Sequence, residues 1–122
     1  MRALVFAIAL AGCAAVGESG EEQLAREIAG RVAGEPRDCV PASTGHTLHA
    51  IDNQTIVYRT SDTVWVNRLG GECSGLGPLS TLQVEAFSSQ FCRGDRVRGV
   101  EPGQSIPGPY CPLGQFVPYR TP

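Results

Sequence analysis

The residues of this chain with the clearest chemistry are its cysteines. Four of them follow the amino-terminal region: Cys39, Cys73, Cys92 and Cys111. The closest of these lie nineteen positions apart, whereas zinc sites and thiol redox centres use close pairs such as Cys-x-x-Cys. An even number of widely spaced cysteines in an exported chain predicts two disulfides and no metal site.

Three pairings of these four cysteines are open. We expect Cys73 to pair with Cys92, because a meander of neighbouring strands would bring them together. We expect Cys39 to pair with Cys111, because a closing barrel would join its first and last strands. A domain of roughly eighty residues buries little apolar surface, so covalent links of this kind would add needed stability.

Two histidines are the next candidates for chemistry. His46 and His49 lie three positions apart, and on a strand this spacing points them to opposite faces. We therefore expect exposed strand residues rather than a metal or acid–base site with Asp52. No serine lies in a Gly-x-Ser-x-Gly elbow, so we assign no catalytic residue and expect no cofactor.

Arg96 and Arg98 are candidate anion-binding residues. On a strand they share one face, where they could contact lipopolysaccharide phosphates or other anionic glycans. The alternative is a solvated face on which they pair with Glu85 or Glu101. Arg93 extends this local basic run.

The first residues predict export. Arg2 precedes an unbroken apolar stretch from Ala3 to Leu10, which is the layout of a secretory signal. The stretch is too short to cross a bilayer, which needs about 20 apolar residues. Leu10-Ala11-Gly12-Cys13 resembles the lipobox of bacterial lipoproteins.

The lipobox resemblance implies that Cys13 is the lipidated first residue of the mature chain, bearing several acyl chains such as palmitate. Several chains on one residue hold a protein firmly to a membrane, whereas one gives marginal attachment. The resemblance further implies the outer membrane, because Ala14 rather than Asp follows the cysteine. The alternative is an ordinary signal peptide and a soluble exported protein.

The charge pattern argues against nucleic acid as a partner. The formal net charge is −2 and every basic residue except histidine is arginine. These arginines are scattered, whereas nucleic-acid binding favours a clustered basic surface.

The elements that would position these residues divide the chain into four parts. Residues 1–12 form the signal peptide, and residues 13–20 form the lipidated cysteine and a flexible tether. Residues 21–34 predict an amphipathic helix, because Leu24, Ile28 and Val32 recur every fourth residue. Ser19 is suited to cap this helix, and Gly34 with the proline after it would end it.

Residues 37–122 predict a small β domain. Six β-prone runs are separated by turn residues, at 46–51, 55–59, 63–69, 82–87, 95–100 and 115–119. Pro118 would place the last run at a sheet edge. The pattern favours a mainly β fold, as a small antiparallel sandwich or a partly open barrel of about six strands, linked by disulfides.

A series of short motifs between Cys39 and Tyr119 carries a second resemblance. They are Cys39, Asp52 with Thr55-Ile56, Val64-Trp65-Val66-Asn67-Arg68-Leu69, Cys73-Ser74-Gly75-Leu76, Phe91-Cys92-Arg93-Gly94-Asp95 with Val97, and Cys111-Pro112-Leu113-Gly114-Gln115-Phe116. Together they resemble a family of small exported or lipid-anchored proteobacterial proteins with no assigned activity. That family more often has Pro at position 74 and commonly Tyr at position 65. The resemblance implies export and architecture, and it implies no catalytic residue.

These observations predict a lipoprotein of the bacterial cell envelope that faces the periplasm. We expect a non-enzymatic structural or partner-binding role, with an envelope protein or an anionic glycan as partner. The first alternative is a periplasmic inhibitor or ligand-binding β module. A hydrolase-type enzyme is the lesser alternative.

Overall fold

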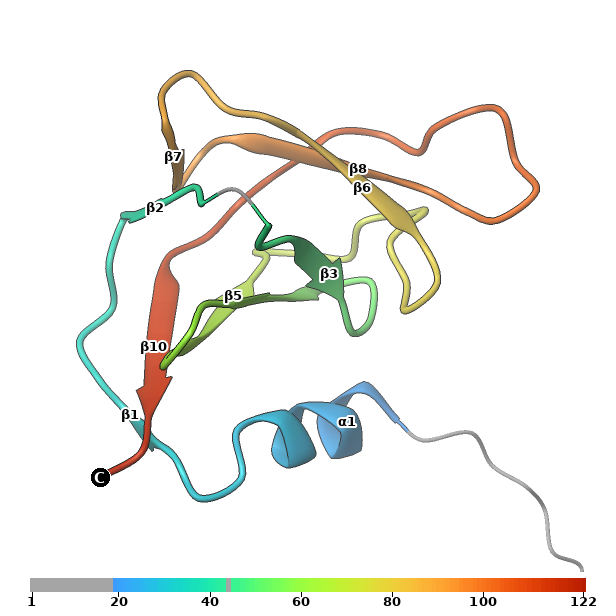
Figure 1. Cartoon of the computed structure of the whole chain (residues 1–122). Helices are drawn as coiled ribbons and strands as arrows, with labels where there is room; N and C mark the ends of the chain where they lie inside the picture. Colours follow the sequence, from blue (N-terminus) through green and yellow to red (C-terminus); the bar gives the residue numbers. More distant parts are fainter. Residues whose placement is uncertain (1–18, 44) are drawn as a thin grey trace, which may run out of the picture.

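The computed structural model describes residues 19–43 and 45–122 (Figure 1). The predicted signal peptide, the lipobox-like motif and residues 13–18 of the predicted tether therefore lie outside the described residues. The described chain is mainly β, with one short helix, which confirms the predicted fold class. Its elements are α1 (Gly20–Glu27), β1 (Val32–Ala33), β2 (Cys39–Pro41), β3 (Leu48–Ala50), β4 (Thr55–Arg59), β5 (Val64–Arg68), β6 (Thr81–Glu85), β7 (Gln90–Cys92), β8 (Arg96–Val100), β9 (Cys111–Pro112) and β10 (Phe116–Arg120).

The strands form three open antiparallel sheets rather than a closed barrel. The largest has the strand order β1-β10-β5-β4-β3. A second sheet pairs β2 with β7, and a third has the order β6-β8-β9. In Figure 1 the five-stranded sheet lies between α1 on one side and the two smaller sheets on the other.

Each of the six β-prone runs contains a strand. The ends of these strands lie within two residues of the predicted ends. The four other strands, β1, β2, β7 and β9, are only two or three residues long. Runs this short show no periodicity that can be read, because an alternating pattern needs about four residues.

The five-stranded sheet is buried on both faces. Ile56, Tyr58 and Trp65 point to the side of the two smaller sheets, where they join the larger hydrophobic cluster. Val57 and Val64 alternate with them and pack beneath α1 with Leu24. Successive side chains of a strand point to opposite faces, so the mostly apolar runs of β4 and β5 supply both clusters.

Helix α1 begins where the sequence predicts and ends earlier. The Ser19 hydroxyl oxygen accepts a hydrogen bond from the backbone N–H of Glu22 at 3.2 Å, which confirms the predicted cap. The predicted range 21–34 is wrong beyond Glu27, because Gly30 takes a left-handed conformation with φ +73°. Val32, the third residue of the predicted stripe, then lies in β1 and is 60% exposed.

The prediction that Pro118 marks a sheet edge is also wrong. Strand β10 lies between β1 and β5. The Pro118 carbonyl accepts a hydrogen bond from Gly34 N–H at 2.7 Å, on the β1 side of the strand. A residue's N–H and C=O point to the same side of an antiparallel strand, so the N–H that proline lacks would have pointed toward β1 and not toward β5.

Candidate functional site

Two disulfides join segments that are distant in sequence. Cys39 bonds to Cys92, and Cys73 bonds to Cys111. The prediction of two disulfides is confirmed, and the favoured pairing is wrong. Because the sheets stay open, Cys39 in β2 lies directly opposite Cys92 in β7, rather than beside the end of a closed barrel.

The two histidines do not form a common site. The His46 ring makes an edge contact with Tyr58, with ring centroids 6.5 Å apart. His49 Nε2 lies 3.0 Å from Glu27 Oε1 on helix α1. The Asp52 carboxylate accepts a hydrogen bond from Gln54 N–H at 2.9 Å and so stabilises its own turn. Within residues 19–43 and 45–122, no three His, Cys, Asp or Glu side chains form a group that could hold a metal ion.

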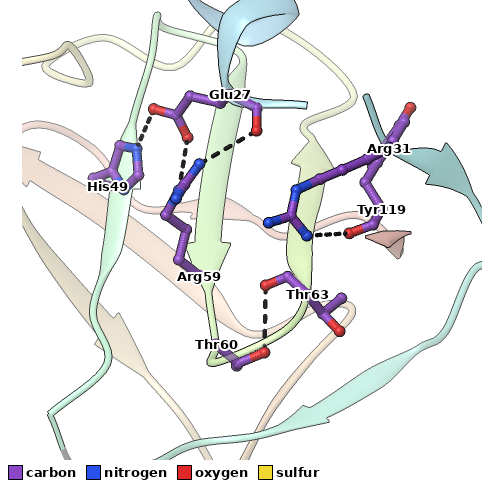
Figure 2. A network of polar contacts seen from close by, with 7 residues as sticks. All are labelled: Glu27, Arg31, His49, Arg59, Thr60, Thr63 and Tyr119. Atoms are coloured by element: carbon purple, nitrogen blue, oxygen red, sulfur yellow. Dashed lines mark hydrogen bonds and ion pairs between the residues drawn. The ribbon is translucent and has the colours of Figure 1, made fainter. Parts of the chain in front are cut away.

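A polar network fastens α1 and the segment after it to the five-stranded sheet (Figure 2). The Glu27 carboxylate lies between His49 of β3 and Arg59 of β4, with Arg59 Nε 3.6 Å from Glu27 Oε2. Arg59 Nη2 also donates to the Glu27 carbonyl at 3.2 Å. Beyond the helix, Arg31 Nη1 donates to the Tyr119 carbonyl at 3.3 Å. The network therefore has a structural role in holding the helix.

Replacing Glu27 by Gln is expected to loosen α1 without unfolding the sheets. The change removes the charge that attracts Arg59, and this half-buried pair contributes about 1 kcal/mol or less. Hydrogen exchange of the α1 amides should become several-fold faster, while exchange in β4 and β5 stays unchanged. The control is Glu72→Gln, an exposed residue outside the helix and its network. Equal exchange in the two variants would show that the network does not hold the helix.

The candidate anion-binding residues lie on the outer surface of the three-stranded sheet. Arg96 and Arg98 of β8 stand opposite Glu85 and Gln83 of β6, respectively. Arg96 forms an ion pair with the Glu85 carboxylate, which confirms one of the two pairings considered. Arg98 Nε donates to Gln83 Oε1 at 2.7 Å.

Tyr110 completes this surface. The guanidinium carbon of Arg98 lies 4.5 Å from the centroid of the Tyr110 ring, and that of Arg96 lies 5.2 Å from it. Both arginines therefore share one face, as the sequence predicts. We call the five side chains the arginine face: Gln83, Glu85, Arg96, Arg98 and Tyr110. Sequence reasoning missed Tyr110, which precedes β9, a strand of only two residues.

Arg93 is not part of the arginine face, although it belongs to the same basic run. It lies 4.0 Å from the Asp38 carboxylate. It also lines a shallow groove of about 370 Å³ over β5 and β10, together with Arg68, Val66 and Val117. Arg68 itself pairs with Glu21 of α1 at 3.0 Å.

A second contact between arginines and an aromatic ring covers the edge of the hydrophobic core. Arg37 and Arg120 lie 5.9 Å and 5.5 Å from the centroid of the Trp65 ring. Trp65 is only 5% exposed, so here the arginine side chains cover buried apolar surface. Tyr110 differs, because it is half-buried at the outer surface of a sheet.

Comparison of this chain with family models, curated proteins and solved structures finds no match. The two resemblances carried by the sequence motifs therefore stay predictions. In the part of the chain that the structure describes, no helix has the length and apolar character needed to span a bilayer.

Proposed function

We propose that this chain is a lipid-anchored protein of the bacterial cell envelope, attached through Cys13 and facing the periplasm. The support comes from the lipobox Leu10-Ala11-Gly12-Cys13 after an apolar stretch. Cys13 lies outside the described residues, so its role rests on the sequence. Ala14 at the next position favours the outer membrane.

The two disulfides are the observation that carries the proposal. Structural disulfides form and persist in oxidising compartments such as the periplasm and are rare in the cytosol. Cys73 is completely buried in the larger hydrophobic cluster, and Cys39 and Cys92 form a cross-strand bond. Both bonds are built into the fold, so export through the predicted signal accounts for their formation.

The anchor would keep the β domain close to the membrane surface. Only five residues separate Cys13 from Ser19, where the described structure begins. A fully extended chain spans at most about 3.3–3.6 Å per residue, so the reach from Cys13 to Ser19 is about 20 Å. A partner of this domain would therefore be a component of the same envelope.

Replacing Cys13 by Ala is expected to abolish lipid attachment. Cells fed a clickable fatty acid should label the natural chain, and the variant should lose essentially all of that label. In cell fractionation the natural chain should sediment with membranes, and the variant should not. Equal labelling of the two chains would contradict the proposal, whereas an unlabelled but exported natural chain would support the soluble alternative.

We propose a non-enzymatic, partner-binding role for the β domain. The arginine face supports it, because it presents charged and hydrogen-bonding groups together on a rigid sheet. The same face favours a ligand-binding β module as the second candidate over an inhibitor of an envelope enzyme. A hydrolase-type enzyme is the weakest candidate, since the arginine face contains no serine, cysteine or histidine to act as a nucleophile or a paired base.

A further inference from the structure

The two arginines of the arginine face differ in charge balance. Arg96 is neutralised by Glu85. Arg98 is hydrogen-bonded to Gln83, which carries no charge. Among residues 19–43 and 45–122, Arg98 forms no ion pair with an Asp or Glu side chain. The positive charge of Arg98 is therefore available to a ligand, whereas that of Arg96 is already paired with the Glu85 carboxylate.

The hydrogen bond from Arg98 also leaves one bidentate edge of its guanidinium open. Gln83 Oε1 takes only the Nε hydrogen of the guanidinium. No described residue accepts a hydrogen bond from the two terminal nitrogens of Arg98, Nη1 and Nη2. These two nitrogens form a planar fork that matches the two oxygens of a phosphate or carboxylate group.

The Arg98 side chain is held in place before any ligand arrives. It is half-buried and stacks on Tyr110. Tyr110 in turn lies between Pro109 and Cys111, and Cys111 is tied to Cys73 by a disulfide. Fixing an arginine in its binding conformation reduces the entropy lost when a ligand binds.

The surroundings of Arg98 favour a sugar over a lipid. Thr81 and Gln83 are exposed on the same side of β6 as Glu85, and such hydroxyl and amide groups can hydrogen-bond to sugar hydroxyls. The large apolar side chains that are strongly exposed, Val32, Leu79, Phe87 and Ile106, all lie outside the arginine face. The apolar surface beside Arg98 is limited to the Tyr110 ring, Pro112 and the half-buried Val100, which is little for an acyl chain to contact.

We propose that the arginine face binds an anionic glycan, with Arg98 holding a sugar-borne phosphate or carboxylate through its terminal nitrogens. This inference rests on the proposed partner-binding function and names the ligand class. Arg96 is a positioning residue, because it holds Glu85 away from the ligand and flanks Tyr110. Freeing Arg96 from Glu85 should accordingly add a second cation to the site.

The test measures binding to the purified full-length chain in an uncharged detergent. Glucose 1-phosphate is the probe, glucose is the uncharged control, and the ¹⁵N signals of the arginine Nε–H groups are the readout. We expect the Arg98 signal to shift with glucose 1-phosphate and not with glucose. Arg98→Gln should weaken binding at least tenfold. Arg98→Lys should give an intermediate loss, because it keeps the charge and loses the planar fork.

Two further variants separate the site from general charge effects. Arg93→Gln removes the same charge at an exposed position outside the arginine face, and binding should stay within about twofold of the natural chain. Glu85→Gln should strengthen binding about threefold, because it leaves Arg96 uncompensated. Equal weakening by Arg93→Gln and Arg98→Gln, or weaker binding by Glu85→Gln, would overturn the proposal.

The source of the anion is tested in parallel. Inorganic phosphate that binds as tightly as glucose 1-phosphate would overturn the role of the sugar. Tighter binding to micelles containing phosphatidylglycerol than to glucose 1-phosphate would replace the glycan by a lipid headgroup. These measurements use purified protein, so a negative result leaves the fatty-acid labelling of Cys13 unaffected, and the two proposals can fail separately.

Discussion

Replacing Cys73 and Cys111 together by alanine is expected to lower the free energy of unfolding by about 4 kcal/mol. The bond closes a loop with a sequence separation of 38, and a link of this length restricts the unfolded chain by roughly that amount in the chain-entropy description. Cys73 is also completely buried among apolar side chains, so the lost sulfur contacts add to the effect. Urea unfolding followed by tryptophan fluorescence measures the change.

The pairing of the cysteines is tested by matched double variants. Cys39→Ala with Cys92→Ala should cost a similar amount, because the sequence separation of that pair is 53. Cys73→Ala with Cys92→Ala removes one partner of each bond, so it should cost more than either native pair. If this mixed variant were no less stable than the other two, the pairing would be contradicted. Peptide mapping without reduction should recover Cys39 linked to Cys92.

Asn67→Ala is expected to lower the free energy of unfolding by about 3 kcal/mol, the second largest effect. Asn67 is fully buried in β5. Its side chain donates to the Gly114 carbonyl and accepts from the Gly114 N–H, each at 2.8 Å. The substitution removes both hydrogen bonds, leaves the backbone of Gly114 without these partners and opens a small cavity.

The control for Asn67 is Asn53→Ala, the same change at an exposed position in the turn before β4. It should alter the free energy of unfolding by less than about 0.5 kcal/mol. A second test of the same contact is Gly114→Ala. This change should also lower the free energy of unfolding, because a Cβ there would collide with the Arg68 carbonyl oxygen. A small effect of Asn67→Ala would mean that the contact between β5 and the segment before β10 contributes little.

Most of the longer elements could be predicted from the sequence because their signals are local. The β-prone runs of β4 and β5 and the Ser19 cap of α1 depend on neighbours a few positions away. The end of α1 could not be predicted in the same way. Gly34 and the proline after it are strong stop signals, yet Gly30 ends the helix earlier because Val32–Ala33 pairs with β10.

The arginine face also combines features that the sequence predicts with features that depend on the tertiary structure. That Arg96 and Arg98 share a face follows from the two-residue period of a strand. Which of them forms an ion pair depends on the register between β6 and β8, which places Glu85 opposite Arg96 and Gln83 opposite Arg98. Tyr110 reaches both arginines from a segment next to a two-residue strand, and no local pattern indicates that contact.

Four features follow from the amino-acid sequence alone: the mainly β class, the positions of the longer strands, the start of the helix and the formation of two disulfides. Each depends on residue type and short-range spacing. The pairing of the cysteines, the four short strands and the surroundings of Arg98 become visible in the folded chain and not before. These features depend on which strands become neighbours. The strands become neighbours in the arrangement that buries both faces of the five-stranded sheet at once.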